Sequence, residues 1–325
     1  PGRGRDRVTG VAPSAAAAIG QTPLVDLARI TADMNGQKLM KLEYLNPGAS
    51  KKDRAALRII EEAERSGELQ PGQTVLELTS GNMGTGLAIV CAVRGYPFVA
   101  VMSTGNSPER AAMMRALGAE VILVEQSAGA IPGEVRGDDL RLVEDEAVRL
   151  AEARGAFRAD QFALAGNRNA HYFGTAPEIW AQSEGSVTVF CDFAGSGGTF
   201  AGCARFFREQ EAGVQCYVVE PAGAAALAGD PVTSPEHPIQ GGGYSMSSLA
   251  QFDEIEPDGY LVVTPRDAIN CAQRLAREEG IFAGFSSGAN LAAALQLLET
   301  RLPGATVAVI ACDSGLKYLS TDLWA

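Results

Sequence analysis

Apolar residues in this chain gather in short runs separated by helical patterns. The runs are almost continuously apolar, as strands covered on both faces of a sheet are. Because their lengths suit strands and they alternate with helical segments, we expect an α/β fold with mostly parallel sheets. The expected strands are residues 38–45, 74–79, 97–102, 120–125, 187–194, 215–220, 260–265 and 305–311.

The helical patterns between these strands carry recognisable ends. Ser50, Ser107 and Thr264 each stand where a side-chain oxygen caps the first N–H groups of a helix. The helices that follow are expected within residues 54–67, 107–118 and 264–280, and each of them closes at a glycine. Residues 126–139 fit neither pattern, and we expect a long surface loop there.

Composition narrows the class of protein. The chain has 325 residues, of which 46% are hydrophobic and 20% charged, as in a globular protein of roughly two domains. No apolar run approaches the roughly 20 residues that cross a bilayer, so no membrane partner is expected. The net charge of −12 comes without a dense basic patch. A small-molecule partner is therefore expected in place of a nucleic acid.

Cysteine and histidine usage points to a reducing compartment. The six cysteines have no C-x-x-C spacing, and most of them lie in apolar segments. We expect buried, reduced thiols and a cytoplasmic protein. Only two histidines occur, so no metal site is expected.

Two neighbouring lysines, Lys51 and Lys52, follow a strand and a turn at the start of an expected helix. Helical neighbours point about 100° apart, so the two amines cannot do the same job. Burial and the positive end of a helix dipole lower the pKa of an amine and favour a neutral nucleophile. The alternative is that both lysines are solvated charges.

Three glycine-containing turns follow strands or precede helices. Residues 77–88, "ELTSGNMGTGLA", place Thr79, Ser80, Gly81 and Asn82 before a helix, where backbone N–H groups bind a carboxylate. The alternative is a capped turn whose glycines only permit tight packing.

Residues 193–202, "FAGSGGTFAG", form a second such turn. They match neither nucleotide fingerprint, since no Lys follows the glycines and Phe200 takes the place of a third glycine. The glycines and hydroxyls still suit a phosphate, unless the turn is merely structural. In the third turn, residues 280–295, Ser286 or Ser287 either caps a helix or bonds a ring nitrogen. An amine, a carboxylate turn, a phosphate cradle and a hydroxyl together suit pyridoxal 5'-phosphate and an amino acid.

The order of motifs resembles the cysteine synthase and cystathionine β-synthase group of fold-type II pyridoxal-phosphate enzymes. The family carries similar "IGNTPL", "NP…S…KDR", "TSGNTG", "QF", "PEIW", "GTGGT", "GISSGA" and "DSGERYLST" motifs. Their counterparts here lie at residues 19–24, 47–54, 79–84, 161–162, 177–180, 195–199, 284–289 and 313–321.

The resemblance implies two three-layer α/β domains in the tryptophan synthase β-like arrangement. The smaller, mobile domain spans 46–160 and holds the carboxylate loop. The larger domain spans 1–45 and 161–325 and holds the phosphate loop. A homodimer is also implied.

The resemblance also assigns roles to individual residues. Lys52 precedes the Asp-Arg pair and matches the Schiff-base lysine, whereas Lys51 stands where the family usually has an apolar residue. The implied cofactor-binding residues are Lys52, Asn82, Gly195, Ser196, Gly197, Gly198, Thr199 and Ser286. The implied substrate-binding residues are Thr79, Ser80, Gly81, Met83 and Gln161.

The implied reaction is β-replacement on an O-activated L-serine through an aminoacrylate, with Lys52 as general base. Met83 replaces a family Thr, and residues 239–248, which include Tyr244, match only at their start. The nucleophilic co-substrate is therefore either sulfide, as in cysteine synthase, or an amine, a hydroxylated urea or another thiol. The alternatives are a cystathionine β-synthase-like condensation, a serine/threonine dehydratase on the same fold, or an inactive binding homologue.

Overall fold

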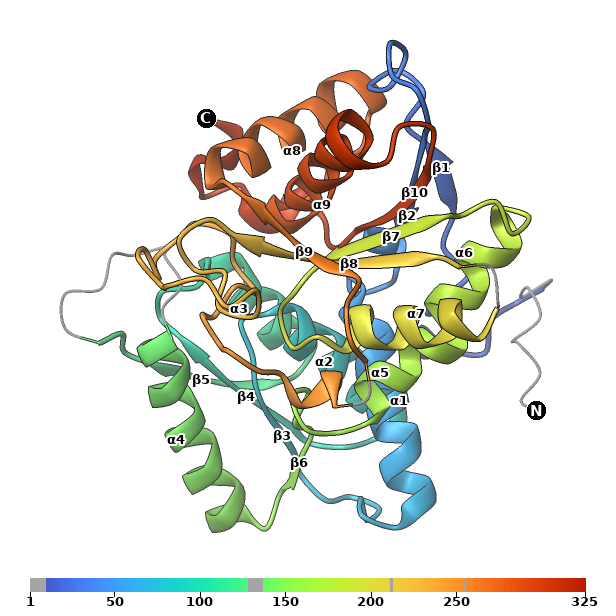
Figure 1. The fold of residues 1–325 in the computed structure, drawn as a ribbon. Helices are drawn as coiled ribbons and strands as arrows, with labels where there is room; N and C mark the ends of the chain where they lie inside the picture. Colours follow the sequence, from blue (N-terminus) through green and yellow to red (C-terminus); the bar gives the residue numbers. More distant parts are fainter. Residues whose placement is uncertain (1–9, 128–136, 211–212, 254) are drawn as a thin grey trace.

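The computed structural model describes residues 10–127, 137–210, 213–253 and 255–325. Within these ranges the chain forms two sheets, each covered by helices on both faces (Figure 1). The predicted α/β fold with mostly parallel sheets is confirmed. No helix in the described ranges combines the length and apolar character that crossing a membrane requires.

The larger sheet has the strand order β1-β2-β10-β7-β8-β9. Its neighbours pair in parallel, except that β1 runs antiparallel to β2. Its strands are β1 Leu24–Asp26, β2 Gln37–Leu42, β7 Val189–Phe193, β8 Gln215–Pro221, β9 Gly259–Val263 and β10 Thr306–Ala311.

The smaller sheet has the order β5-β4-β3-β6, and all of its neighbours pair in parallel. Its strands are β3 Val75–Leu78, β4 Phe98–Ser103, β5 Glu120–Val124 and β6 Phe157–Arg158. Both sheets are therefore built from β-α-β units, which place strand-to-helix turns at the carboxyl ends of the strands.

Helices cover both faces of each sheet. α9 and α8 lie over one face of the larger sheet, and α7 lies over the other. α4 covers one face of the smaller sheet, and α2 and α3 cover the opposite face. The helices are α1 Lys52–Ser66, α2 Asn82–Arg94, α3 Pro108–Ala116, α4 Gly137–Arg154, α5 Gly166–Ala170, α6 Ala176–Gln182, α7 Gly198–Glu209, α8 Pro265–Glu279 and α9 Phe285–Gln296.

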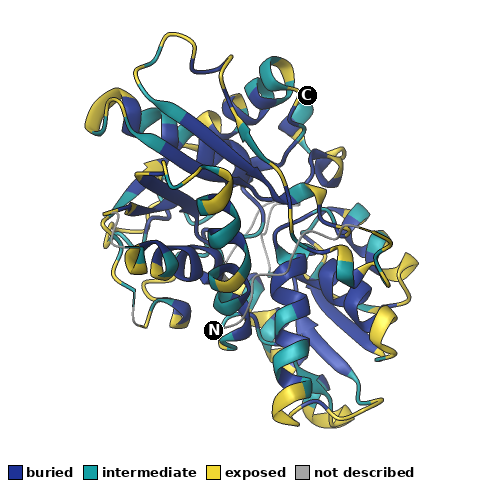
Figure 2. Cartoon of the chain, turned by 90° about the vertical axis from the view of Figure 1, so that its right-hand side faces the viewer, coloured by how far each residue is buried: buried dark blue, intermediate teal, exposed yellow. Residues whose placement is uncertain are grey.

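The apolar strands are buried because helices remove both faces of each sheet from water. Figure 2 shows the strands as the buried interior, with exposed residues at helix ends and turns. One apolar cluster fills the space between the larger sheet and α8 and α9, and another, rich in Phe, packs α7 on its opposite face. Two further clusters lie on the two faces of the smaller sheet.

Several local predictions need correction. The strand expected at 38–45 ends at Leu42, and Glu43–Leu45 form a 3-10 turn. Ser50 is not the N-cap of α1. Lys51 occupies that position, because Ser50 is held in a β-bridge to Asp313.

The sequence patterns did not predict the short strands β1 and β6. The surface loop expected at 126–139 lies partly outside the described residues, and its last residues begin α4. Thr264 is confirmed as an N-cap whose side chain accepts the Asp267 N–H. All six cysteines are buried and free, as predicted. The boundaries 46–160, 1–45 and 161–325 stay predictions.

Candidate active site

Lys52 is the first residue of α1, and its side chain points toward the turn after β7. Its Nζ donates a hydrogen bond to Ser196 Oγ at 3.0 Å. Burial, and then the positive charge of Lys51, lower the pKa of Lys52 from 10.5 to about 8. The amine therefore becomes neutral far closer to physiological pH than an ordinary lysine does. This is the state that a nucleophile or a general base needs.

Lys51 takes a different direction from its neighbour, as the helical geometry predicts. Its Nζ contacts both carboxylate oxygens of Asp192, at 2.8 and 2.7 Å. Burial opposes the charge of this amine, but the attraction of Asp192 outweighs it and raises the pKa of Lys51 above its usual value. Neither lysine is a solvated surface charge.

The predicted phosphate loop, residues 195–199, joins β7 to α7 in a conformation that requires glycine. A Cβ on Gly195 would lie 2.6 Å from the carbonyl oxygen of Gly241, and Gly197 has a φ of +85°. A Cβ on Gly198 would overlap the side chain of Asn167. The loop therefore offers bare backbone beside the first N–H groups of a helix, which is an anion-binding arrangement.

Two hydroxyl groups of this loop are held by residues that the sequence analysis missed. Ser196 Oγ accepts hydrogen bonds from Lys52 and, at 2.8 Å, from Asn167 Nδ2. Thr199 Oγ1 lies 3.3 Å from Nε2 of His171. Burial, then the nearby cations Lys51 and Arg54, lower the pKa of His171 well below its usual value, so its ring is neutral.

The predicted carboxylate loop follows β3 and opens α2. Thr79 Oγ1 accepts the N–H groups of Gly81 and Gly84, both at 2.9 Å, so its own hydrogen is free to be donated. Gly81 has a φ of +127°, and a Cβ there would lie 2.5 Å from the Arg110 side chain. Arg110 in turn donates to the Ser80 carbonyl at 2.6 Å. The Thr79 hydroxyl therefore holds the backbone of the loop, and the Arg110 side chain fixes the Ser80 carbonyl.

Asn82 is held by charged groups from the C-terminal segment. Its Nδ2 donates to Asp313 Oδ2 and its Oδ1 accepts from Lys317 Nζ, both at 2.7 Å. Lys317 also donates to the Gly48 carbonyl. Burial, despite Asp313 and Asp53, lowers the pKa of Lys317 to about 8. These contacts fix the amide of Asn82, and the sequence analysis did not anticipate Lys317.

Gln161 lies opposite the carboxylate loop and is positioned by a buried carboxyl group. Its backbone N–H and its Nε2 both lie 3.3 Å from Glu77 Oε1. Burial raises the pKa of Glu77 to about 8, although the nearby Arg158 opposes this rise. Glu77 was read only as part of a strand, and no spacing signal marked it as a partner of Gln161.

Ser286 lies in the first turn of α9 and is 8% exposed. Neither serine of the pair caps the helix, since Gly284 occupies the N-cap position. Ser287 instead accepts the backbone N–H of Cys312 at 2.9 Å. The Ser286 side chain lines the same pocket as Cys312.

Most of the predicted site residues meet in two adjoining pockets that share Lys52, Asn82, Ser196 and Gly241. The first pocket is also lined by Gly195, Gly197, Thr199 and Ser286. The second is also lined by Ser80, Met83 and Gln161. Gly198 begins α7 beside the first pocket, and Gly81 caps α2 beside the second.

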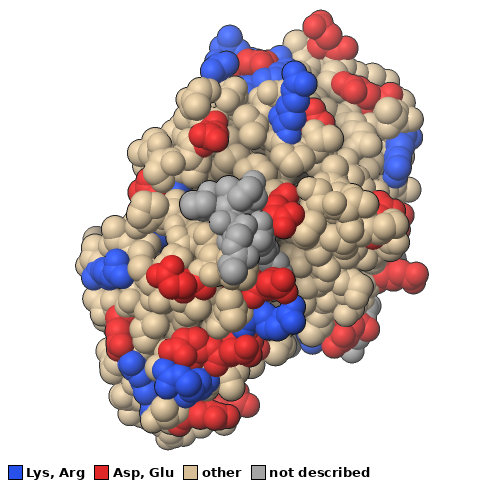
Figure 3. All heavy atoms as spheres, turned by 90° about the vertical axis from the view of Figure 1, so that its left-hand side faces the viewer, with Lys and Arg blue, Asp and Glu red and all other residues tan. Residues whose placement is uncertain are grey.

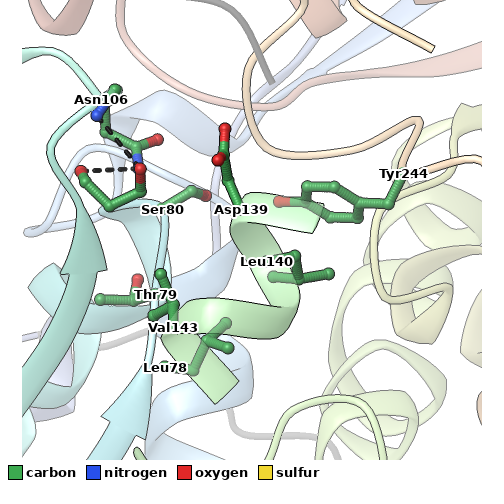
Figure 4. Close-up of a pocket in the computed structure, with 10 residues that line it drawn as sticks. Leu78, Thr79, Ser80, Asn106, Asp139, Leu140, Val143 and Tyr244 are labelled. Atoms are coloured by element: carbon green, nitrogen blue, oxygen red, sulfur yellow. Dashed lines mark hydrogen bonds between the residues drawn. The ribbon is translucent and has the colours of Figure 1, made fainter. Parts of the chain in front are cut away.

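Thr79 faces a third pocket behind the carboxylate loop, and Lys52 does not line that pocket. Figure 4 shows it between Leu78, Leu140 and Val143, with the ring of Tyr244 extending toward Asp139 and Ser80. Tyr244 and Ser80 line this pocket together, and both also line the second pocket. Tyr244 therefore links the unmatched segment 239–248 to the carboxylate loop.

Charged side chains of both signs are interspersed on the face shown in Figure 3. Among the described residues, no group of three or more His, Cys, Asp or Glu side chains could hold a metal ion.

The pocket chemistry fits pyridoxal phosphate. A phosphate needs the bare backbone at 195–199, and an aldehyde needs an amine that can become neutral, which Lys52 provides. A ring hydroxyl matches the oriented amide of Asn82, and a ring nitrogen matches the Ser286 hydroxyl. All four groups line the first pocket or begin the helix beside it.

Comparisons with known proteins agree with this chemistry. Cysteine synthase B of Escherichia coli is 40% identical over 306 residues, which cover 94% of each chain. The crystal structure of an O-ureido-L-serine synthase superimposes with a TM-score of 0.87 at 37% identity and covers 97% of this chain and 96% of that one. An O-acetylserine dependent cystathionine beta-synthase from Helicobacter pylori gives a TM-score of 0.87 at 31% identity, covering 97% and 100%.

These similarities confirm the fold-type II assignment made from the motifs. The family model described as "Pyridoxal-phosphate dependent enzyme" matches residues 15–313, most of the chain. On this match and the 40% identity above, the chain belongs to the family of pyridoxal-phosphate dependent enzymes.

Proposed function

We propose that this enzyme catalyses β-replacement on an O-activated L-serine, in the manner of a cysteine synthase. The observation that carries the proposal is the position of the Lys52 amine, which lines both the pocket of the phosphate loop and the pocket of the carboxylate loop. An amino acid whose carboxylate occupies the second pocket would thus bring its α-carbon to this amine. The cysteine synthase relatives support the same reaction class.

Pyridoxal phosphate, when bound, supplies a conjugated ring that stabilises negative charge at the substrate's α-carbon. Lys52, neutral above about pH 8, takes the α-proton as general base and later returns it. Ser196 holds the Lys52 amine at 3.0 Å and so limits where that proton can go. A proton transfer needs such a defined donor and acceptor geometry.

The remaining residues bind and orient. The Ser80 segment and Gln161, which line the second pocket, would hold the substrate carboxylate, and the helix dipole of α2 favours an anion there. Thr79 would position this turn, because its hydroxyl accepts the Gly81 and Gly84 N–H groups. Asn82 would bond the ring hydroxyl of the cofactor. Ser286 offers the ring nitrogen a neutral partner, which leaves that nitrogen largely unprotonated. A milder electron sink of this kind suits elimination and replacement at the β-carbon.

Closure of the smaller domain, residues 46–160, over the rest of the chain would exclude water while the β-carbon is reactive. The carboxylate loop follows β3 of the smaller sheet, whereas the phosphate loop follows β7 of the larger sheet. Binding of the substrate carboxylate would therefore draw the two domains together.

A nucleophile larger than sulfide is the second candidate. Phe162 and Tyr244 line both the Lys52 pocket and a neighbouring cavity of about 600 Å³. That volume holds a small organic molecule, and sulfide needs far less. An organic thiol, as in a cystathionine β-synthase-like condensation, an amine or a hydroxylated urea therefore remains open as co-substrate. No contact among the described residues favours the dehydratase.

The experiment mixes the purified enzyme separately with O-acetyl-L-serine and O-phospho-L-serine and follows the cofactor absorbance. A spectral change with one of them, followed by product formation only when a nucleophile is added, is the expected result. Sulfide, homocysteine, hydroxyurea and a primary amine then identify the co-substrate. Rapid pyruvate and ammonia release without any nucleophile would instead establish the dehydratase, and no spectral change with any serine derivative would contradict the proposal.

Two further properties belong to this proposal. The family resemblance supports a homodimer, which sedimentation equilibrium would test against a monomer of 34.0 kDa. The six buried, free thiols support a cytoplasmic location, because reducing compartments keep such thiols reduced. Fractionation of the source cells would test the location.

A further inference from the structure

Lys51 has no part in the mechanism above, yet it is a buried cation that lines the same pocket as Lys52. The side chain of Lys51 is 11% exposed and that of its partner Asp192 is 2% exposed. Taking two charges out of water is costly, and a surface ion pair would avoid that cost. A buried pair at the wall of a reactive pocket therefore calls for a physical explanation.

The pair is held in place from the larger sheet. Asp192 lies on β7, three residues before the phosphate loop begins at Gly195. Asn290 of α9 donates to Asp192 Oδ1 at 3.1 Å and to the Ile310 carbonyl at 2.9 Å, and its Oδ1 accepts the Phe193 N–H at 2.7 Å. The hydrogen bond from Asn290 fixes the Asp192 carboxylate. The ion pair with Asp192 in turn fixes the Lys51 amine.

Cys312 lies beside this pair and lines the same pocket as Ser286, the residue proposed to face the cofactor's ring nitrogen. Its Sγ donates to Asp192 Oδ1 at 3.9 Å and accepts from Asn290 Nδ2 at 3.5 Å. The first pocket is lined by Lys51, Cys312 and Ser286, and also by Lys52. The Lys51 cation and the Lys52 amine therefore border the same pocket.

We propose that Lys51 and Asp192 are a positioning pair whose fixed cation disfavours a second positive charge in the pocket, either on the Lys52 amine or on the cofactor's ring nitrogen. The inference rests on the proposed function, because it assigns the pair a role toward the cofactor bound by Lys52. Asp192 keeps Lys51 charged, and Lys51 in turn favours the neutral form of Lys52. The pair acts through its field and touches no reacting atom.

The charges that face Lys52 give the sign of the effect. Lys51 lowers the pKa of Lys52, whereas Asp192 and Glu77 raise it, and Lys51 has the largest effect of these three. Burial raises the pKa of the Cys312 thiol to about 12, so this group adds no charge. Neutral His171 adds no charge on this side. Removing the Lys51 cation should therefore raise the pKa of Lys52 even when Asp192 is removed together with it.

The test compares Lys51→Met, the double variant Lys51→Met with Asp192→Ser, and Lys51→Arg in the cofactor-loaded enzyme. The readouts are the pH midpoint of the bound cofactor's absorbance and the acidic limb of the rate at which O-acetyl-L-serine changes that absorbance. We expect both midpoints to rise by about one unit or more in Lys51→Met, by a smaller but measurable amount in the double variant, and little in Lys51→Arg. Lys51→Arg keeps the cation and serves as the rescue.

The matched control is Lys41→Met, which breaks another buried ion pair, to Glu178, outside both pockets. This variant should lower the thermal unfolding midpoint and leave both pH midpoints unchanged. Unchanged pH midpoints in Lys51→Met and in the double variant, or equal shifts in Lys41→Met, would overturn the proposal. If Lys51→Met does not fold, the double variant decides by the same criterion. Failure of the proposed function is distinguishable, since the wild-type enzyme would then respond to no serine derivative.

Discussion

The turns after β3 and β7 are built alike and differ in what supports them. Each joins a buried strand to a helix through glycines with positive φ, at Gly81 and Gly197. The turn after β7 presses against backbone, because a Cβ on Gly195 would meet the Gly241 carbonyl. The turn after β3 instead rests on side chains, those of Thr79 and Arg110.

This difference matches the two ligands proposed for the turns. A backbone cradle cannot adjust, and it suits a cofactor phosphate that stays bound through many turnovers. A turn held by one hydroxyl group and one arginine side chain can adjust more readily, and it suits a substrate carboxylate that enters and leaves. Lys52 lies between the two turns, so it can serve both ligands.

The largest effect is expected where the two turns meet. Lys52→Ala should lower the rate of β-replacement by about 10²–10⁴-fold or more, because the general base is removed. Steady-state assay of the product would measure the loss. Lys51→Arg keeps a cation beside the site and is the control. A Lys52→Ala enzyme with half of its activity would remove Lys52 from the mechanism.

The phosphate turn should tolerate no added methyl group. Gly195→Ala should weaken cofactor binding by about 1–3 kcal/mol, roughly 5- to 150-fold, because the Cβ meets the backbone of Gly241. Absorbance titration with pyridoxal phosphate after dialysis would measure this affinity. Gly67→Ala is the control: its φ of +80° strains the backbone of an alanine, but its Cβ would meet nothing within 4 Å and the residue lines neither pocket. Equal affinities in both variants would refute the rigid cradle.

Matched threonine variants sharpen the contrast between the two turns. Thr79→Val removes the acceptor of two N–H groups, and it should raise the KM for the serine derivative about tenfold while the cofactor stays bound. Thr199→Val should do the reverse, with weaker cofactor binding and little change in KM. Kinetics and cofactor titration on both proteins check this. If both variants affected the same ligand, the division of labour would be wrong.

The smallest effect concerns pH. Because the pKa of Lys52 is lowered to about 8, the neutral fraction falls as the pH drops through that value. The rate of the amino-acid half reaction should decrease about threefold between pH 8.5 and 7.5. Stopped-flow absorbance across this range would measure it. A rate that is flat down to pH 6 would mean that another group takes the proton.

The sequence predicted the sheets well, because fully covered strands are apolar along their whole length. It failed at 43–45, where Tyr44 and Leu45 continue an apolar pattern although the backbone has already turned. It also failed at Ser50, a good capping residue that tertiary pairing with Asp313 recruits into a bridge. Local preference is a weak predictor where a distant strand competes for the same backbone groups.

The sequence predicts the two turns but not the distant residues that contact the site. Glycines and hydroxyl residues that follow a strand mark the turns at residues 79–84 and 195–199. Asp192 contacts Lys51 across 141 positions, and Lys317 contacts Asn82 across 235. No spacing rule relates residues so far apart. Such partners become visible only when the fold brings the carboxyl ends of separate strands together.

The most direct test of the account is to find which amine carries the cofactor. The chain has only five lysines, Lys38, Lys41, Lys51, Lys52 and Lys317. Reduction of the cofactor-loaded enzyme with borohydride, followed by proteolysis and mass spectrometry, would place the cofactor's mass on one of them. The account predicts that Lys52 carries it in the wild-type enzyme and that Lys52→Ala carries none. A label on Lys51 or on any other lysine, or no label at all, would contradict it.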